Sequence, residues 1–161
     1  MTDRTIPGEI NQSIIPYLTI KSAGKAIEFY KKAFGAKEIG RISMPDGKVG
    51  HAELQIGNSI IMLSDEVPEW GNRAPDSIEE SAVSICLYVE NVDEIFKRAI
   101  EAGAKIRKNM EVKDQFYGDR SGGLTDPFGH KWTIATQIEK MSFEEMQKRS
   151  DRVFSQQRAN V

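Results

Sequence analysis

The chain repeats one order of elements twice, and an internal repeat constrains a fold more strongly than any single local propensity. Gly35-Ala36-Lys37 in the first half aligns with Gly103-Ala104-Lys105 in the second, at an offset of 68 residues. Leu18 aligns with Leu87 at an offset of 69. Each half reads as a strand, a helix and three further strands. We therefore predict an α+β fold built from two β-α-β-β-β modules.

Hydrophobic periodicity and turn residues place the elements of each module. In the first we expect a helix over about 26–34, ended by Gly35, and strands over 13–20, 36–44, 48–56 and 59–64. In the second we expect a helix over 92–100, ended by Gly103, and strands over 82–89, 104–112, 122–126 and 130–137. Gly57-Asn58 has the pattern of a two-residue hairpin loop, and Asp126-Pro127-Phe128-Gly129 has that of a tight turn.

These elements define the predicted domain organisation. Residues 13–138 form one domain, with module one at 13–64, a linker at 65–81 and module two at 82–138. Residues 1 to about 12 are polar, and we expect them to be loosely held. A third helix is predicted over 142–159, where Ser142 and Glu145 have the spacing of a capping box. Its apolar stripe would pack on its own domain or on a partner subunit.

Composition excludes several classes of function. The formal net charge is −2, so the chain has no basic footprint for nucleic acid. Cys86 is the single cysteine, which excludes an internal disulfide and suits a reducing compartment. No apolar run approaches the roughly 18 residues of a membrane span, and the first ten residues do not form a signal peptide. We expect a cytoplasmic protein without a membrane partner.

Three stretches resemble one protein family when they are taken together. They are IPYLTIKSAGKAIEFYKKAFGAKE, GKVGHAELQIGNSIIMLSDE and YGDR…DPFGHKW. The chain from Ile14 to about Ile138 resembles the vicinal oxygen chelate superfamily, which includes glyoxalase I, extradiol dioxygenases and bleomycin-resistance proteins. The PhnB-like branch is the most similar. The resemblance implies two modules forming an incompletely closed barrel around a cavity, usually in a homodimer.

The resemblance also identifies where a metal would sit. Glyoxalase-type members carry four His or Glu ligands on the first and last strands of each module. Those positions fall here on Ile15, Met62, Ser84 and Thr133, none of which supplies an imidazole or a carboxylate. We therefore expect no cofactor. A divalent metal displaced onto His51 and Glu53 is the weaker alternative, because two protein ligands are too few for a complete site.

Alternation along 48–56 suggests where a ligand would bind. Ala52, Leu54 and Ile56 should face a helix, so His51 and Glu53 should face the cavity, with side chains roughly 6 to 7 Å apart. Either residue could contact a ligand, or this face could simply be wetted by solvent. Tyr17, Cys86 and Tyr88 should face the same way by strand parity, with Cys86 as an inert small residue. Trp132 should pack under a helix.

Two loops supply the remaining candidates. Tyr117 and Arg120 could contact a ligand at the cavity mouth, since Arg offers a fork for carboxylate or phosphate and Tyr offers a flat face with a polar tip. An Asp119–Arg120 pair that only pins the loop is the slightly favoured alternative. Trp70 could cover the cavity, although anchoring of the linker on the core is favoured. The predicted ligand-binding residues are Tyr17, His51, Glu53, Trp70, Tyr88, Tyr117 and Arg120.

Three functional hypotheses follow. The first, which we prefer, is a glyoxalase- or bleomycin-resistance-like protein that binds a small organic ligand without the usual metal site and without a catalytic residue. The second is a lyase-, isomerase- or dioxygenase-type enzyme that uses a shifted metal or Glu53 as a general base. The third is an interaction module that works through its C-terminal helix.

Overall fold

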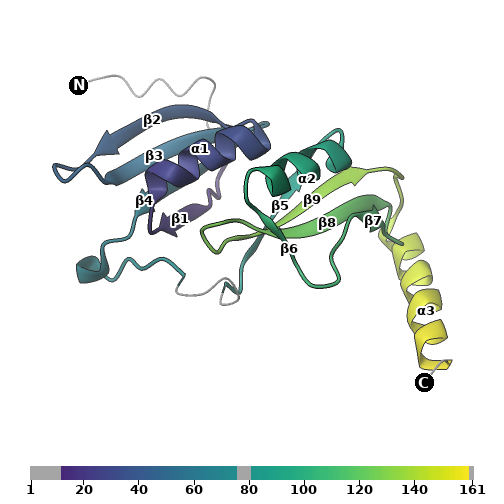
Figure 1. Cartoon of the computed structure of the whole chain (residues 1–161). Coiled ribbons are helices and arrows are strands. Elements are labelled where there is room, and N and C mark those ends of the chain that lie inside the picture. Colours follow the sequence, from purple (N-terminus) through teal and green to yellow (C-terminus); the bar gives the residue numbers. More distant parts are fainter. Residues whose placement is uncertain (1–11, 76–80, 160–161) are drawn as a thin grey trace. The chain divides into compact units, whose positions relative to one another are not determined.

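The computed structural model describes residues 12–75 and 81–159, and it has the predicted α+β class (Figure 1). Two β-α-β-β-β modules are followed by a C-terminal helix. The chain divides into two compact units, one of residues 1–81 with 127–129 and the other of residues 82–126 with 130–161. Within the described residues the longer strands pair in two separate sheets, and no sheet closes into a barrel.

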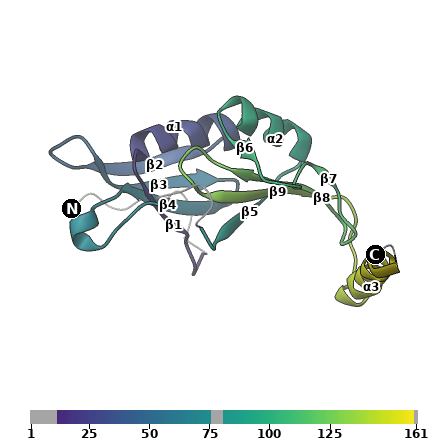
Figure 2. The same cartoon turned by 60° about the horizontal axis from the view of Figure 1, so that its bottom comes forward.

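Module one is a four-stranded sheet with one helix along one face (Figures 1 and 2). Its elements are β1 (Tyr17–Ile20), α1 (Ala23–Phe34), β2 (Lys37–Ser43), β3 (Val49–Ile56) and β4 (Ser59–Asp65), and the strand order is β1-β4-β3-β2. β1 runs parallel to β4, and the other pairs are antiparallel. Apolar side chains of α1, such as Ile27 and Tyr30, are buried with Leu18, Leu54 and Leu63 of the sheet.

Both ends of α1 have a clear physical cause. Gly35 adopts φ 67°, and its N–H bonds to the carbonyl of Lys31, so the helix ends at the predicted glycine. At the other end, Oδ1 of Asp65 accepts from the N–H of Ala23 at 2.9 Å. Oδ2 of the same carboxylate accepts from the N–H of Val49 at 2.8 Å. The last residue of β4 therefore joins the start of α1 to the start of β3.

Module two repeats this plan with modified edge strands. Its elements are β5 (Ser84–Tyr88), α2 (Val92–Glu101), β6 (Lys105–Ile106), β7 (Lys113–Asp114), β8 (Asp119–Thr125) and β9 (Lys131–Gln137), with strand order β5-β9-β8-β6 and β7 paired to β8. β5 is parallel to β9. Thr136 has the role of Asp65, because its hydroxyl oxygen accepts from the N–H of Val92 at 2.8 Å. Trp132 is buried, as predicted.

Two predicted strands of module two were wrong in extent. The expected strand over 104–112 is only the two-residue β6, because the chain turns where the N–H of Met110 bonds to the carbonyl of Arg107. Asn109 in that turn has φ 58°, which a strand does not allow. The expected strand over 122–126 begins earlier, at Asp119, because residues 119–121 pair with 135–137 of β9.

The predicted turns are confirmed. Ile56 pairs with Ser59 across Gly57-Asn58 in a two-residue hairpin. At the other turn, the N–H of Asp126 bonds to the carbonyl of His130 at 2.9 Å. The Asp126 carboxylate accepts from the N–H of His130 at 2.9 Å and from Nε1 of Trp132 at 3.0 Å. The Asp of the turn therefore also fixes the buried indole of the following strand.

The two segments expected to be irregular are partly ordered. Residues 1–11 and 76–80 lie outside the described residues. Gln12 is held, since its side-chain amide donates to the carbonyl of Ile60 at 3.1 Å and accepts from the N–H of Ile60 at 2.7 Å. In the linker, Val67 and Asn72 form an isolated antiparallel bridge around the short 3₁₀ helix η1 (Pro68–Trp70). Within the described residues, no helix has the length and apolar character needed to cross a membrane.

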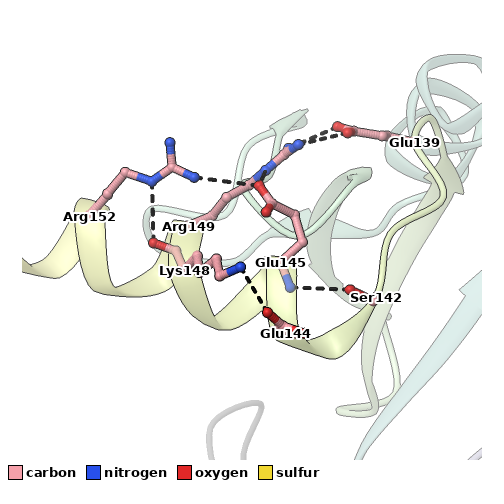
Figure 3. A network of polar contacts seen from close by, with 7 residues as sticks. All are labelled: Glu139, Ser142, Glu144, Glu145, Lys148, Arg149 and Arg152. Atoms are coloured by element: carbon pink, nitrogen blue, oxygen red, sulfur yellow. Dashed lines mark hydrogen bonds and ion pairs between the residues drawn. The ribbon is translucent and has the colours of Figure 1, made fainter.

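The third helix, α3 (Phe143–Ala159), begins at the predicted cap, where the hydroxyl of Ser142 accepts from the N–H of Glu145 at 3.3 Å. Figure 3 shows the polar contacts along its first turns. Arg149 donates to both oxygens of Glu139, at 2.8 and 2.7 Å, and to Glu145 at 3.0 Å. These ion pairs connect the helix to the segment that follows β9. Phe143 is 87% exposed.

Candidate functional site

The sheet of module one has one face under α1 and one face that α1 does not cover. Strand parity assigns Tyr17, Met62 and Glu53 to the uncovered face, since Met62 pairs with both Tyr17 and Glu53. Leu18 and Leu54, which alternate with them, are buried. The prediction that His51 and Glu53 face away from the helix is therefore confirmed.

Tyr17, His51 and Glu53 form a continuous hydrogen-bonded array on this face. The hydroxyl of Tyr17 lies 3.1 Å from Nδ1 of His51, and Nε2 of His51 lies 3.2 Å from Oε1 of Glu53. Glu53 is only 7% exposed, whereas Tyr17 is 49% exposed. The array therefore runs from a surface hydroxyl to a buried carboxylate.

The chemistry of the three groups gives this array a direction. An ionised carboxylate only accepts hydrogen bonds, so a neutral His51 beside it carries its hydrogen on Nε2. Nδ1 then accepts from the Tyr17 hydroxyl. This arrangement fixes the imidazole ring and leaves the lone pairs of the Tyr17 oxygen for a ligand donor. It also provides a path by which a proton could move between the surface and Glu53.

A second polar group borders the array. Thr19, two residues after Tyr17 on β1, donates from its hydroxyl to Oδ1 of Asn72, and Nδ2 of Asn72 lies 3.4 Å from the hydroxyl of Ser64. Asn72 thereby ties the linker segment to the uncovered face. Trp70 on the same segment is 76% exposed, so the favoured interpretation that it anchors the linker on the core was wrong. Its role as a ligand contact stays a prediction.

Module two also has polar side chains on the sheet face opposite α2. Tyr88 pairs with Ala135, and Ala135 pairs with Ser121, so all three share this face with Asp119. The Tyr88 hydroxyl donates to Oδ2 of Asp119 at 2.6 Å. The hydroxyls of Tyr117 and Ser121 lie 3.4 Å apart. Tyr88 and Tyr117 therefore belong to one group of polar side chains in module two.

Arg120 lies on the opposite face of the same strand. It donates to both oxygens of Asp93 on α2, at 2.8 Å each, and to Asp114 on β7 at 2.9 Å. The loop-pinning interpretation fits this geometry, but the expected partner was wrong, because Asp119 bonds to Tyr88 instead. Contact between Arg120 and a ligand stays a prediction, and it would have to compete with two carboxylates.

The Tyr88–Asp119 bond has a consequence at alkaline pH. The hydrogen bond to Asp119, with further contributions from partial burial and the charge of Asp119, raises the pKa of Tyr88 to about 12, whereas an unperturbed tyrosine has a pKa of about 10. Tyrosine ionises first in the unfolded chain. The bond therefore stabilises the fold below pH 10, and this contribution is lost as the pH rises to 12.

We expect the stability advantage of the wild type over Tyr88→Phe to be constant from pH 7 to 9 and to shrink by pH 11. Phenylalanine preserves the ring but donates no hydrogen bond, so the pair of proteins isolates the hydroxyl. Urea denaturation at each pH, followed by circular dichroism, measures the difference. A difference that stays constant up to pH 11.5 would contradict the assignment of the bond.

The donor chemistry of the strands bears on a metal site. Met62 lies beside Tyr17, and Thr133 lies beside Cys86, on the uncovered faces of the two sheets. Ile15 precedes β1, and Ser84 pairs with Lys131. None of these four positions offers an imidazole or a carboxylate, and among their strand partners Glu53, which pairs with Met62, supplies a carboxylate. Among residues 12–75 and 81–159, no three His, Cys, Asp or Glu side chains are close enough to form a metal-binding group.

Comparison with known proteins gives the family. Residues 12–134 match the family model of the Glyoxalase/Bleomycin resistance protein/Dioxygenase superfamily. The chain belongs to this superfamily. Among curated proteins, the uncharacterized protein Rv0887c of Mycobacterium tuberculosis is 40% identical over 146 residues, covering 89% of this chain and 85% of that protein.

Two solved structures have the same fold. A PhnB protein from Bacillus cereus, described as a putative 3-demethylubiquinone-9 3-methyltransferase, matches with a TM-score of 0.61 and 19% identity, covering 78% of this chain and 99% of that one. The fosfomycin resistance protein FosX of Listeria monocytogenes, solved with Mn(II) and sulfate, matches with a TM-score of 0.60 and 22% identity, covering 88% and 99%. The predicted resemblance to the superfamily is confirmed by the family model, and the PhnB protein shares the fold.

Sequence reasoning did not identify two residues that organise these faces. Asn72 holds the linker on module one, and no local sequence pattern marks it. Asp119 was interpreted only as a partner of its neighbour Arg120. Consecutive residues of a strand point to opposite faces, so a strand predicted to begin at Asp119 would have separated the two side chains.

Proposed function

We propose that this superfamily member is a small-molecule-binding protein that lacks the usual metal site. The observation that carries the proposal is the Tyr17–His51–Glu53 array on a sheet face that no helix of its module covers. A hydrogen-bonded row that includes a nearly buried carboxylate is the kind of preorganised polar group that orients a ligand. The aromatic rings of Tyr17 and His51, with centroids 5.7 Å apart, supply apolar contact area beside it.

The donor set supports the metal-free part of this proposal. Superfamily members with metal chemistry use the ion as a Lewis acid on substrate oxygens. Here the corresponding positions hold Ile15, Met62, Ser84 and Thr133, which suit a hard divalent cation poorly. The array would instead present hydrogen-bond acceptors, so a ligand with N–H or cationic groups fits it best. Trp70, Tyr88, Tyr117 and Arg120 remain the other proposed ligand contacts.

Elemental analysis of the purified protein, followed by a thermal-shift screen, tests this proposal. We expect less than stoichiometric divalent metal and no fall in melting temperature after chelation. We also expect some amine-bearing small molecules to raise the melting temperature, since a ligand that binds only the folded state stabilises it. Stoichiometric metal, together with a turnover that chelation destroys, would contradict the proposal.

A specific observation also supports a second candidate, an enzyme that uses Glu53 as a general base. Glu53 is nearly buried and lies 3.2 Å from an imidazole that itself contacts a surface hydroxyl. Such a relay could accept a proton from a bound substrate and return it to solvent. This candidate needs the array to touch the reacting atoms, whereas the binding protein needs it only to hold the ligand.

We propose further that the protein is a cytoplasmic homodimer. Superfamily members often dimerise, and α3 exposes Phe143 and Phe154, which are 87% and 53% accessible in the single chain. Sedimentation of the same purified sample measures the oligomeric state. A monomer at micromolar concentration would contradict the dimer, and an unchanged dimer after deletion of residues 142–161 would exclude α3 as its interface.

A further inference from the structure

Three aspartates are almost completely buried within the described part of the chain. Asp65 is 6% exposed, Asp119 is 7% exposed and Asp126 is 2% exposed. Removing a carboxylate from water is costly unless hydrogen bonds replace the lost hydration. The bonds that each carboxylate makes therefore indicate whether its role is purely structural.

Two of the three carboxylates have partners on both oxygens. Asp65 accepts from the N–H groups of Ala23 and Val49, and Asp126 accepts from the N–H of His130 and from Trp132 Nε1. Each of them joins separate parts of its module. These bonds are sufficient to explain why both residues are buried.

Asp119 differs, because only Oδ2 has a partner, the Tyr88 hydroxyl at 2.6 Å. Within the described residues, Oδ1 of Asp119 makes no hydrogen bond or ion pair. No fully enclosed side-chain oxygen or nitrogen among these residues lacks a partner. Oδ1 is therefore not fully enclosed. A small molecule with an N–H donor could bind there.

The surroundings of Asp119 favour a cation. Its neighbour Arg120 points to the other face of the sheet and is occupied by Asp93 and Asp114, so it does not neutralise Asp119. The Tyr88 ring, at the other end of the hydrogen bond, is 59% exposed. A negative charge beside an accessible aromatic ring attracts ammonium and guanidinium groups through charge-assisted hydrogen bonds and cation–π contact.

We propose that Asp119 and Tyr88 form a binding site for a cationic nitrogen group, an alkylammonium or a guanidinium, carried by a small molecule. Oδ1 of Asp119 accepts from the N–H of the cation, and the Tyr88 ring contacts its face. Tyr88 holds the carboxylate in place through Oδ2. This site rests on the proposed ligand-binding function, because Tyr88 is one of its proposed contacts. It shares no residue with the Tyr17–His51–Glu53 array, so the two can be tested separately.

Cys86 provides a built-in reporter for this site. It is the only cysteine in the chain and lies two residues before Tyr88 on β5, on the same face of the strand. Partial burial, followed by the negative charge of Asp119, raises the pKa of its thiol. A cation bound to Asp119 cancels that charge and lowers the thiol pKa. The thiolate fraction then rises, and with it the rate of modification.

The experiment measures the rate at which methyl methanethiosulfonate, a small neutral reagent, modifies Cys86 at pH 8. Methylguanidinium chloride is titrated at constant ionic strength, and methylurea serves as the uncharged control of the same shape. We expect a saturable rise of about threefold in the rate with methylguanidinium, because the thiolate fraction increases, and no rise with methylurea.

Two variants assign the effect to the proposed residues. Asp119→Asn should abolish the response, while Asp151→Asn, which changes an exposed aspartate of α3, should leave it intact. Tyr88→Phe keeps the carboxylate, so it should still respond. An equal response in the wild type and Asp119→Asn would overturn the proposal, as would a response to methylurea or a rise that does not saturate. If Asp119→Asn fails to fold, methylguanidinium and methylurea are compared on the wild type and on Tyr88→Phe. A saturable response to methylguanidinium alone in both proteins supports the proposal, and any other result overturns it.

Discussion

Replacing Asp65 with alanine is expected to lower the free energy of unfolding by about 3 kcal/mol, the largest effect on stability that we predict for a single polar residue. Hydrogen bonds to a charged group contribute about 1.5–3 kcal/mol each, and two buried N–H groups would be left without a partner. Those N–H groups belong to Ala23 at the start of α1 and to Val49 at the start of β3. The mutation therefore loosens the helix and the hairpin of module one together.

Urea denaturation followed by far-ultraviolet circular dichroism measures this loss. Asp46→Ala is a matched control, because Asp46 also accepts from a backbone N–H, that of Lys48 at 3.1 Å, but its side chain is 52% exposed. We expect a change of less than about 1 kcal/mol for the control, since water can replace an exposed partner. Asp65→Asn, which keeps a single acceptor oxygen, should lie between the two. Equal effects of Asp65→Ala and Asp46→Ala would show that the two hydrogen bonds of Asp65 do not stabilise module one.

The repeat predicted the fold well because each module uses the same local rules. Gly35 ends α1 in the left-handed conformation, as the pattern predicted. The hydrogen bond from the last strand of each module to the start of its helix could not be predicted from the repeat, because module one uses Asp65 and module two uses Thr136. A carboxylate and a hydroxyl look unrelated in sequence, but each accepts from the N–H of the first residue of the helix in its own module. Their equivalence appears only when parallel pairing brings the last strand beside the first.

Strand propensity failed where the backbone left the extended region. Residues 104–112 contain enough apolar positions to suggest one strand, but the turn at 107–110 divides it. Asn tolerates a positive φ better than most residues, so Asn109 was the available signal. The same stretch brings Met110 over Gly123, where an added Cβ would lie 2.6 Å from the Met110 methyl group. The glycine of β8 thus accommodates the inserted turn.

Alternation along β3 predicted which way His51 and Glu53 face, since a period of two needs no knowledge of the partner strands. It could not predict that Tyr17 completes the array, because that contact depends on β1 and β3 lying on either side of β4. Nor could it predict the exposure of Trp70, which follows from the closed turn between Val67 and Asn72. The face on which a strand side chain lies can be predicted from the strand's own sequence, whereas its hydrogen-bond partners depend on the register of all three strands.

Replacing Glu53 with glutamine is expected to weaken binding of an amine-bearing ligand by about tenfold or more, since charge-assisted hydrogen bonds are roughly twice as strong as neutral ones. Glutamine has the same length, and its side-chain oxygen can still accept from Nε2 of His51. The substitution therefore removes the negative charge while keeping the hydrogen-bonded array. Isothermal titration calorimetry with a compound identified by thermal shift measures the change in affinity.

Gln55→Ala is the control for this substitution. Gln55 lies two residues from Glu53 on the same strand and face. Within the described residues, the hydrogen bond of its side-chain amide goes to the carbonyl of Gly57, at 3.1 Å. We expect Gln55→Ala to bind the ligand as the wild type does. If both substitutions weaken binding equally, the array does not determine affinity and the proposed site is wrong.

The same variant separates the two candidate functions. If Glu53 is a general base, Glu53→Gln should abolish a measurable turnover while the ligand still binds, because an amide cannot accept the proton. If Glu53 only holds the ligand, affinity should fall and no turnover should be found in either protein. Tyr17→Phe sharpens the distinction, since it breaks the relay to the surface but leaves Glu53 charged. A relay predicts that Tyr17→Phe slows turnover at constant affinity, whereas a binding site in which Tyr17 contacts the ligand predicts weaker binding alone.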